Sequence, residues 1–276
     1  MFTLNCRGRL LAADKPLVMG ILNVTPDSFY GASRMAATGA LLQKAEQMLA
    51  EGASILDIGG QSTRPGSQAV GQEEELQRVI APIAALHQQL PGAVISIDTF
   101  YAKVAAAAVA AGASIVNDIS AGEMDAEMLP AVAALKVPYI CMHMKGSPQT
   151  MQQHTHYHNL LQEITGYFIA KLDQCKAAGI QDVIIDPGFG FSKTTAQNFT
   201  LLKQLQLLQV LGRPVLAGLS RKGSIYKTLG STAENALNGT TVLNTLALQN
   251  GAAILRVHDV KEAVEAITLY NAYLNA

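Results

Sequence analysis

Glu51-Gly52-Ala53-Ser54-Ile55 recurs along the chain as Ala111-Gly112-Ala113-Ser114-Ile115, and again as Asn250-Gly251-Ala252-Ala253-Ile254. Each copy follows a segment with helical periodicity and precedes a short apolar run, as Gly179-Ile180 does more loosely. Glycine immediately after a helix permits the left-handed backbone turn that ends it. The repeated motif therefore predicts a chain in which helices alternate with buried strands.

Eight apolar runs have the length of buried parallel strands. Most are separated by segments whose apolar residues recur with the period of a helix, such as 76–90 and 161–175. Strands that alternate with helices form a parallel sheet with right-handed crossovers. The predicted strands are Leu17–Leu22, Ser54–Ile58, Val94–Ile97, Ser114–Val116, Val137–Met142, Val183–Ile185, Pro214–Ala217 and Ala252–Val257.

Eight strand and helix units of roughly 30 to 40 residues, without a linker between them, predict a closed α/β barrel of the (β/α)₈ TIM type. We expect one domain over residues 1–276, and a doubly wound open sheet is the alternative. Residues 1–16 precede the first barrel strand, and we expect this lead-in segment to cover the bottom of the barrel. The active site of such a barrel lies at the opposite, C-terminal mouth.

The composition is that of a folded, near-neutral protein. Hydrophobic residues make up 49% of the 276 residues and the net charge is −1, so nothing indicates binding to nucleic acid or to an anionic membrane. Three scattered cysteines are too few for a disulfide framework and fit a reducing compartment. Because we find no signal-peptide pattern and no apolar run of about 18 residues, we expect a cytoplasmic protein without a membrane span.

Almost every predicted strand ends in a polar or ionisable residue. In a barrel, these strand ends surround the mouth. A carboxylate buried there is costly unless it is paired or hydrogen-bonded. One such residue is explained by a helix cap, but the whole ring indicates a binding site. Its members are Asn23, Asp57, Asp98, Asn117-Asp118, Met142-His143, Asp186, Ser220-Arg221-Lys222, and Arg256 with His258.

Cations and glycines accompany this ring. Arg64, Arg221, Lys222 and Arg256 lie in loops at the predicted mouth, where arginine and lysine suit an anionic ligand such as phosphate. Glycines such as Gly59-Gly60 let backbone amides approach a ligand closely. The carboxylates can accept hydrogen bonds from a nitrogen-rich ring, and the cations can hold a phosphate.

Eight stretches, in order, carry a family resemblance over nearly the whole chain. They are Met19-Gly20-Ile21-Leu22-Asn23-Val24-Thr25-Pro26-Asp27-Ser28-Phe29, Leu56-Asp57-Ile58-Gly59-Gly60-Gln61-Ser62-Thr63-Arg64-Pro65-Gly66, Ile97-Asp98-Thr99, Asn117-Asp118-Ile119, Met142-His143-Met144, Asp186-Pro187-Gly188-Phe189-Gly190-Phe191, Ser220-Arg221-Lys222 and Arg256-Val257-His258-Asp259-Val260. With these stretches the sequence resembles the dihydropteroate synthases, and the first, second and last are long and specific.

The resemblance implies a role for individual residues. The pterin ring would be bound by Asp98, Asn117, Asp186 and Lys222, in a slot lined by Met142, Phe191 and Gly218. Pyrophosphate would contact Asn23, Thr63, Arg64, Arg256 and His258, with Asn23 helping to hold Mg²⁺. The p-aminobenzoate site would be framed by Phe29, Pro65, Ser220 and Lys222. The catalytic residues would be Asp98, Asn117, Asp186, Lys222 and Arg256.

The resemblance also implies the reaction. A member of this family joins 6-hydroxymethyl-7,8-dihydropterin pyrophosphate to p-aminobenzoate, and releases 7,8-dihydropteroate and pyrophosphate in folate biosynthesis. Sulfonamides compete for the p-aminobenzoate site of the family. The resemblance further implies Mg²⁺ as cofactor, a homodimer built from helices distant from the mouth, and two mobile loops, here roughly 24–38 and 59–71, that close over the substrates.

The polar residues at the strand ends suit a dissociative displacement. The pterin ring can delocalise positive charge on the reacting methylene, so the bond to pyrophosphate can break before the amine attacks. Asp98 and Asp186 would then face the cationic ring, while Mg²⁺, Arg64, Arg256 and His258 would face the leaving group. The arylamine is neutral at pH 7 and needs no strong base, so the lack of a Ser-His-Asp signature is no difficulty.

The sequence departs from the family pattern at several positions. Tyr30-Gly31-Ala32-Ser33-Arg34 differs from the usual Ser-Asp-Gly-Gly type of loop, which leaves the closing motion open. Gln61 stands where Glu is usual, and Ser192 replaces a small Gly or Ala. Asn235 and Asn238 stand where relatives often have Arg and His. None of these changes removes a member of the ring.

Two other functions remain open at this point. A pterin-dependent methyltransferase would share Asp98, Asn117 and Asp186, but would have no reason to keep the 62–66 and 256–258 stretches. A non-catalytic pterin-binding relative should have lost a member of the ring. The alternating histidines His154, His156 and His158 lie in a polar connection, and we interpret them as loop residues rather than metal ligands.

Overall fold

The structure, a computed structural model, describes residues 1–24, 34–61 and 70–276. Within them, eight parallel strands form one sheet in the order β8-β7-β6-β5-β4-β3-β10-β9. A parallel bridge between Ile185 and Val215 connects β8 to the chain just before β9, so the sheet closes into a barrel. This confirms the predicted (β/α)₈ class over the open doubly wound sheet. The strands are β3 (Leu17–Asn23), β4 (Ile55–Gly59), β5 (Ile95–Asp98), β6 (Ile115–Asp118), β7 (Tyr139–Met142), β8 (Val183–Asp186), β9 (Leu216–Ala217) and β10 (Ile254–Val257).

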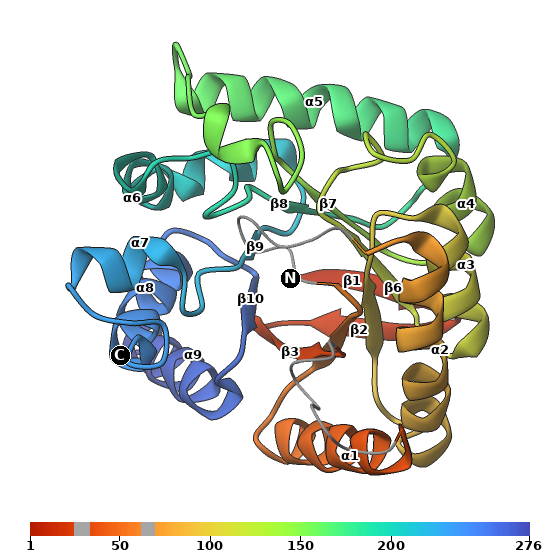
Figure 1. Cartoon of the computed structure of the whole chain (residues 1–276). Helices are drawn as coiled ribbons and strands as arrows, with labels where there is room; N and C mark the ends of the chain where they lie inside the picture. Colours follow the sequence, from red (N-terminus) through yellow and green to blue (C-terminus); the bar gives the residue numbers. More distant parts are fainter. Residues whose placement is uncertain (25–33, 62–69) are drawn as a thin grey trace.

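Helices surround the strands on their outer side (Figure 1). The large core lies between the two layers and contains the outward-facing residues of the strands, for example Ile58, Ile97 and Ile185, together with the buried stripes of the helices. The helices are α1 (Arg34–Ala50), α2 (Gln72–Gln89), α3 (Ala102–Ala111), α4 (Met128–Leu135), α5 (Leu160–Ala178), α6 (Thr195–Lys203), α7 (Gly223–Thr228), α8 (Leu237–Gln249) and α9 (Val260–Leu274), with short 3₁₀ helices η2 (Met151–Gln153) and η3 (Leu205–Leu211).

Each predicted apolar run overlaps one barrel strand, and several strands extend one or two residues beyond the run. The strand β9 is the shortest, with two residues, although the run Pro214–Ala217 has four. Proline has no backbone N–H to donate to a sheet ladder, and Pro214 contributes its carbonyl, which accepts from the N–H of Ile185 at 3.0 Å. The strand is therefore shorter than the hydrophobic pattern predicted.

The repeated glycine motif has the conformation that the sequence predicted. The φ angles of Gly52, Gly112, Gly179 and Gly251 are 105°, 130°, 93° and 87°, a region that side chains strongly disfavour. Packing adds a second requirement at Gly112, where a Cβ atom would lie 2.4 Å from the side chain of His87. The motif thus ends helices and turns the chain back into the barrel.

The lead-in segment covers the bottom of the barrel, as expected. It forms an antiparallel hairpin of β1 (Phe2–Cys6) and β2 (Arg9–Ala13), shown in red near the middle of the barrel in Figure 1. Its buried residues pack against an apolar layer inside the barrel. The sequence did not predict these two strands. None of the described helices is long and apolar enough to cross a membrane.

Candidate active site

Inward-facing side chains fill the barrel in layers. An apolar layer that includes Ile55, Ile115 and Ile184 packs against the hairpin. Alternate residues of a strand face the same side, so the residue two positions further along each strand also faces inward. These residues are Asp57, Asn117, Asp186, Gly218 and Arg256, which follow Ile55, Ile115, Ile184, Leu216 and Ile254. A polar layer therefore lies directly on an apolar one, on the side of the mouth.

Arg256 joins two carboxylates at the centre of this polar layer. Its Nε donates to Asp57 at 2.7 Å, and its Nη2 lies 2.6 Å from an oxygen of Asp57 and 2.6 Å from an oxygen of Asp98. The amide of Asn117 donates to the same Asp57 oxygen at 3.2 Å. Asp57 is fully buried, so it serves mainly to hold Arg256 and Asn117. The structure therefore brings together four of the residues selected from the sequence.

The electrostatics of this cluster are set by burial. Burial raises the pKa of Asp98, and although Arg256 opposes this effect, the nearby carboxylate of Asp57 adds to it. For Arg256, burial favours the neutral form, but Asp57 and Asp98 outweigh it and raise the pKa of the guanidinium above its usual range. The cluster therefore stabilises the Arg256 cation more than it stabilises the Asp98 anion.

A second part of the mouth forms a slot. Lys222 places its Nζ 4.3 Å from the centre of the Phe191 ring, and Phe191 packs in one small apolar cluster with Met142. The carboxylate of Asp186 lies 4.0 Å from the point that a Cβ on Gly218 would occupy. Burial raises the pKa of Asp186, while the N–H of Gly188, which donates to it at 2.8 Å, acts in the opposite direction. The Asp186 carboxylate, the Lys222 ammonium group and the Phe191 ring thus line the slot.

Ser220 and His258 are paired on the rim. The Ser220 hydroxyl accepts from the backbone N–H of His258 at 3.1 Å and lies 3.0 Å from His258 Nδ1. Burial, followed by the Arg256 cation, lowers the pKa of His258 to about 4. With its Nδ1 beside the Ser220 hydroxyl, a neutral His258 offers its Nε2–H as a hydrogen-bond donor. Arg221, one of the cations selected for an anionic ligand, instead forms two hydrogen bonds of 2.9 Å with the carboxylate of Asp259.

Some selected residues cannot be placed. Phe29, Thr63, Arg64 and Pro65 lie outside the described residues.

Asn23, at the end of β3, has its Oδ1 3.7 Å from the point that a Cβ on Gly59 would occupy, and Asp98 has an oxygen at the same distance from that point. The oxygens of Asn23 and Asp98 therefore approach the same point beside Gly59, and oxygen is the kind of ligand that Mg²⁺ prefers.

The departure at Gln61 has a clear structural role. Its amide Nε2 donates a hydrogen bond of 2.8 Å to Glu75, and both side chains are buried. Glutamate at position 61 would have no N–H to donate and would face a second carboxyl. Sequence reasoning did not select Glu75, whose side chain points inward and is fully buried. Its spacing could have indicated this, because Glu75 lies four residues before Val79, and both side chains are buried on the same face of α2.

Replacing Glu75 with Gln should change how stability depends on pH. Burial raises the pKa of Glu75 to about 8. Between roughly pH 4.5 and pH 8 the folded chain then keeps a proton that the unfolded chain loses, so folding stability falls as pH rises, by up to about 1.4 kcal/mol per pH unit. Glu75→Gln should remove this contribution. Chemical unfolding at pH 5, 6.5 and 8 measures it.

Glu74 provides the matched control for this prediction. It lies in the same helical turn but is exposed, with its carboxylate on Arg78. Glu74→Gln should leave the shape of the stability–pH curve unchanged. A Glu75→Gln curve that runs parallel to the unsubstituted one would contradict the inward, protonated carboxyl.

The connection after β7 packs on the loop after β8. The Ser192 hydroxyl, another departure from the family pattern, accepts from the backbone N–H of Lys145 at 2.9 Å. The Tyr157 hydroxyl donates to the Ser192 carbonyl at 3.0 Å. In the same connection, the rings of His156 and His158 make an edge-to-face contact with centroids 5.0 Å apart. Ser192 therefore links two loops in a way that Gly or Ala would not.

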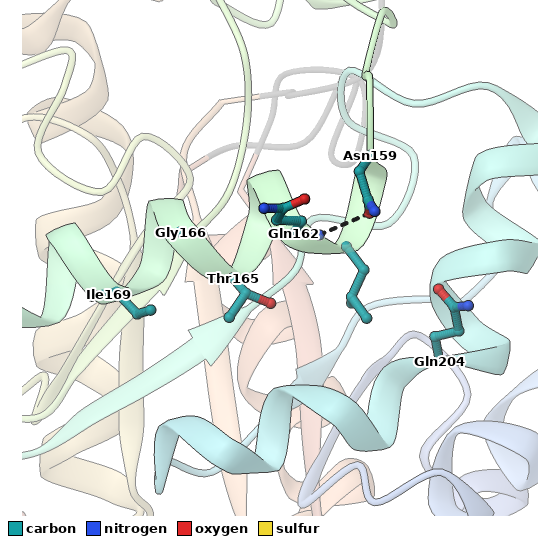
Figure 2. Close-up of a pocket in the computed structure, with 7 residues that line it drawn as sticks. Asn159, Gln162, Thr165, Gly166, Ile169 and Gln204 are labelled. Atoms are coloured by element: carbon teal, nitrogen blue, oxygen red, sulfur yellow. Dashed lines mark hydrogen bonds between the residues drawn. The ribbon is translucent and has the colours of Figure 1, made fainter.

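A pocket on the outer surface lies beside α5, away from the ionisable groups of the mouth (Figure 2). The side chain of Asn159 is engaged as the N-cap of α5, where it accepts from the N–H of Gln162 at 3.1 Å. No lining residue is ionisable, so the pocket has none of the charged groups that meet at the barrel mouth. Its lining residues are Asn159, Leu161, Gln162, Thr165, Gly166, Ile169 and Gln204.

Comparisons with known proteins agree with this geometry. The chain matches the family of pterin binding enzymes over residues 19–258. It is 45% identical over 258 residues to a dihydropteroate synthase of Synechocystis sp., covering 92% of this chain and 89% of the relative. The dihydropteroate synthase of Xanthomonas albilineans with 4-aminobenzoic acid is 44% identical, with a TM-score of 0.92 over 99% of this chain and 98% of that one. The structure of the Xanthomonas albilineans enzyme in complex with 7,8-dihydropteroate is 42% identical, with a TM-score of 0.90 over 100% of both chains.

Proposed function

Because this chain belongs to the dihydropteroate synthase family of pterin binding enzymes, we propose that it joins 6-hydroxymethyl-7,8-dihydropterin pyrophosphate to p-aminobenzoate and releases pyrophosphate. The observation that carries the proposal is the convergence of Asp98, Asp186, Lys222 and Arg256 at one end of the barrel. Anions and cations both meet there, as a cationic ring and an anionic leaving group require. A transferase that produces 7,8-dihydropteroate for folate biosynthesis accounts for the carboxylates and for the cations of the site.

The carboxylates bind the pterin and stabilise its positive charge. Asp186 faces the slot beside Phe191 and Lys222, where a flat ring can stack on the aromatic face and donate its N–H groups to the carboxylate. Asp98 and Asn117 close the other side of the polar layer. As the methylene–oxygen bond breaks, charge develops on the ring, and these fixed anions lower the energy of that state without reorganising.

The cations receive the leaving group. Arg256 is held at the centre of the polar layer by two carboxylates, which engage its Nε and Nη2. The remaining N–H donors of its guanidinium would bind the pyrophosphate. His258 adds a neutral donor at the rim, oriented by Ser220. The bond to pyrophosphate breaks, the electron pair leaves with the pyrophosphate oxygen, and the neutral amine of p-aminobenzoate attacks the methylene and then loses a proton.

Magnesium fits the oxygen donors near Gly59. Asn23 would hold the ion with the pyrophosphate oxygens, and the ion would supply positive charge to the leaving group when bound. The chain's own contribution is the pair of oxygens, from Asn23 and Asp98, that approach one point beside Gly59. Mg²⁺-dependent protection of the pyrophosphate complex against thermal unfolding, reduced in Asn23→Ala, would support this assignment, whereas equal protection in both proteins would oppose it.

The decisive experiment is pyrophosphate release from 6-hydroxymethyl-7,8-dihydropterin pyrophosphate with Mg²⁺, with and without p-aminobenzoate. Release that depends on p-aminobenzoate is the expected result. Pterin binding without release would favour a non-catalytic pterin-binding protein. Methyl transfer from a methylated pterin, without pyrophosphate release, would favour a pterin-dependent methyltransferase.

We also propose a homodimer that uses the outer face of α8 and α9. These helices pack side by side and each carries an exposed apolar pair with i, i+4 spacing: Val242 and Leu246, and Leu269 and Tyr273, whose exposed fractions are 40 to 75%. An apolar stripe shared by two neighbouring helices suits a self-complementary interface.

The buried and unpaired state of Cys6, Cys141 and Cys175 is consistent with placing the protein in the reducing cytoplasm, which cell fractionation would check.

Sedimentation velocity tests the dimer. We expect a dimer at micromolar concentration, and a monomer when Leu246 and Leu269 are both replaced with Glu. Leu207→Glu, at a leucine of η3 whose exposed fraction of 51% lies between those of Leu246 and Leu269, should leave the dimer intact. A monomer before any substitution would reject the proposal.

A further inference from the structure

A buried lysine beneath the slot has no role in the chemistry described above. Lys193 follows the loop after β8, and only 3% of its surface is exposed. Its Nζ donates to the carbonyl of Gly188 at 3.1 Å and to that of Phe191 at 3.0 Å, and it lies 3.1 Å from His143 Nδ1. An ammonium group has three N–H donors, so each of them has an acceptor here.

The acceptors of Lys193 lie in the loop that carries the slot. Gly188 donates its N–H to the Asp186 carboxylate at 2.8 Å, and Phe191 donates its N–H to the Gly188 carbonyl at 3.1 Å. At one end of the loop, Gly188 therefore orients the Asp186 anion. At the other end, Phe191 places its aromatic ring beneath Lys222. Because Lys193 bonds to the carbonyls of Gly188 and Phe191 together, it sets the distance between these two ends.

The opposite wall holds Lys193 in place. His143, at the end of β7, donates its backbone N–H to the Asp186 carbonyl at 2.9 Å, and its ring packs edge-to-face on Tyr167 at 4.8 Å. Space is tight at this point, since a Cβ on Gly188 would lie 2.1 Å from the His143 carbonyl oxygen. With Nδ1 as the acceptor, the neutral His143 ring carries its proton on Nε2.

We propose that Lys193 is a positioning residue for the pterin, whose Nζ clamps the Gly188–Phe191 loop and thereby fixes the Asp186 carboxylate and the Phe191 ring. This inference rests on the proposed function and names a residue that the sequence resemblance did not assign. Burial lowers the pKa of Lys193 to about 7, and Asp186 opposes this effect. The neutral amine keeps two N–H donors for the two carbonyls, so the clamp does not depend on the charge.

The test replaces Lys193 with Met, which keeps the apolar stem and removes the donors. We expect Lys193→Met to weaken binding of 6-hydroxymethyl-7,8-dihydropterin, which cannot react, by about tenfold or more, equivalent to about 1.4 kcal/mol. The KM for the pterin pyrophosphate should rise by a similar factor, while the KM for p-aminobenzoate changes less than twofold. Isothermal titration and steady-state pyrophosphate release give these values.

The control is Lys171→Met. Lys171 is also a buried lysine, but it pairs with Glu123 at 3.3 Å and is not bonded to the slot loop. It should leave both the pterin affinity and the two KM values unchanged. Unaltered pterin affinity in Lys193→Met, or an equal rise in both KM values, would overturn the clamp. Because pterin binding is measured without turnover, a wild-type chain that binds the pterin but releases no pyrophosphate would reject the proposed function alone.

A second measurement needs no variant, in case Lys193→Met fails to fold. The ¹⁵N chemical shifts of the His143 ring in the unsubstituted protein report its tautomer. An unprotonated, hydrogen-bonded Nδ1 with the proton on Nε2 is expected at about pH 5.5, below the pKa of Lys193, where its ammonium group has three N–H groups to donate. A proton on Nδ1 at this pH would show that Lys193 does not donate to this ring and would overturn the arrangement on which the clamp depends.

Discussion

Replacing Asp98 with Asn should lower kcat for pyrophosphate release by about 10²-fold, which corresponds to about 2.7 kcal/mol of transition-state stabilisation. The oxygen of the substituted side-chain amide could still accept the 2.6 Å hydrogen bond that Arg256 donates to Asp98, so the geometry is retained while the negative charge is removed. If positive charge develops on the pterin ring before the amine attacks, that negative charge is what Asp98 supplies. The measurement is steady-state kcat with both substrates saturating.

The expected stability change separates this effect from unfolding. Burial raises the pKa of Asp98, and Asp57 adds like-charge repulsion, so the neutral amide in Asp98→Asn should leave the folded state at least as stable near pH 8. A lower kcat with an unchanged or higher Tm is the predicted combination. Asp182→Asn is the matched control, because Asp182 accepts a 2.6 Å hydrogen bond from the Asn5 N–H at the bottom of the barrel. A kcat within twofold of the original in Asp98→Asn would reject an electrostatic role.

Replacing Arg256 with Met should cost about 3–5 kcal/mol of folding stability at pH 8. The change leaves two buried carboxylates, Asp57 and Asp98, facing each other without the cation that joins them. The orphaned carboxylates would take up protons more readily in the folded than in the unfolded chain. The loss of stability should therefore be larger at pH 8 than at pH 6. Urea unfolding at both values measures the difference.

A double substitution gives the sharper form of this test. Asp98→Asn in the Arg256→Met background removes one of the two unpaired charges, so it should recover a large part of the lost stability. Asp98→Asn alone should have little effect on stability. Additive effects would mean that Arg256 and Asp98 do not interact in solution as they do here. Arg256→Met should also weaken pyrophosphate binding more than p-aminobenzoate binding, and equal losses would count against its place at the leaving group.

The local pattern of the sequence was sufficient for the barrel. A glycine with a left-handed backbone ends a helix wherever it occurs, and Gly52, Gly112 and Gly251 do so at three of the predicted junctions. Alternation along a strand is equally local, so Ile184 and Asp186 share one face of β8. These regularities depend on residues two to five positions apart, and a single sequence displays them in full.

The same reasoning could not predict which residues of the site bond to each other. The family resemblance implied that Asp98 binds the pterin and that Arg256 contacts pyrophosphate, but it did not predict that these two side chains bond to each other across the barrel. Neither the inward turn of Glu75 nor the clamp formed by Lys193 was predicted, since a charged residue in a helix start or after a loop is usually solvated. The roles of Phe29, Thr63, Arg64 and Pro65 stay predictions.

What the sequence by itself determined is the order of strands and helices and the set of polar residues at the strand ends, because both depend on short-range periodicity and backbone conformation. The tertiary structure alone decided which of those residues pair. Arg256 meets Asp57 from 199 positions away only because β10 and β4 both flank β3 in the closed barrel. Once water is excluded from that interior, each buried charge requires a partner, and barrel closure determines which partner is within reach.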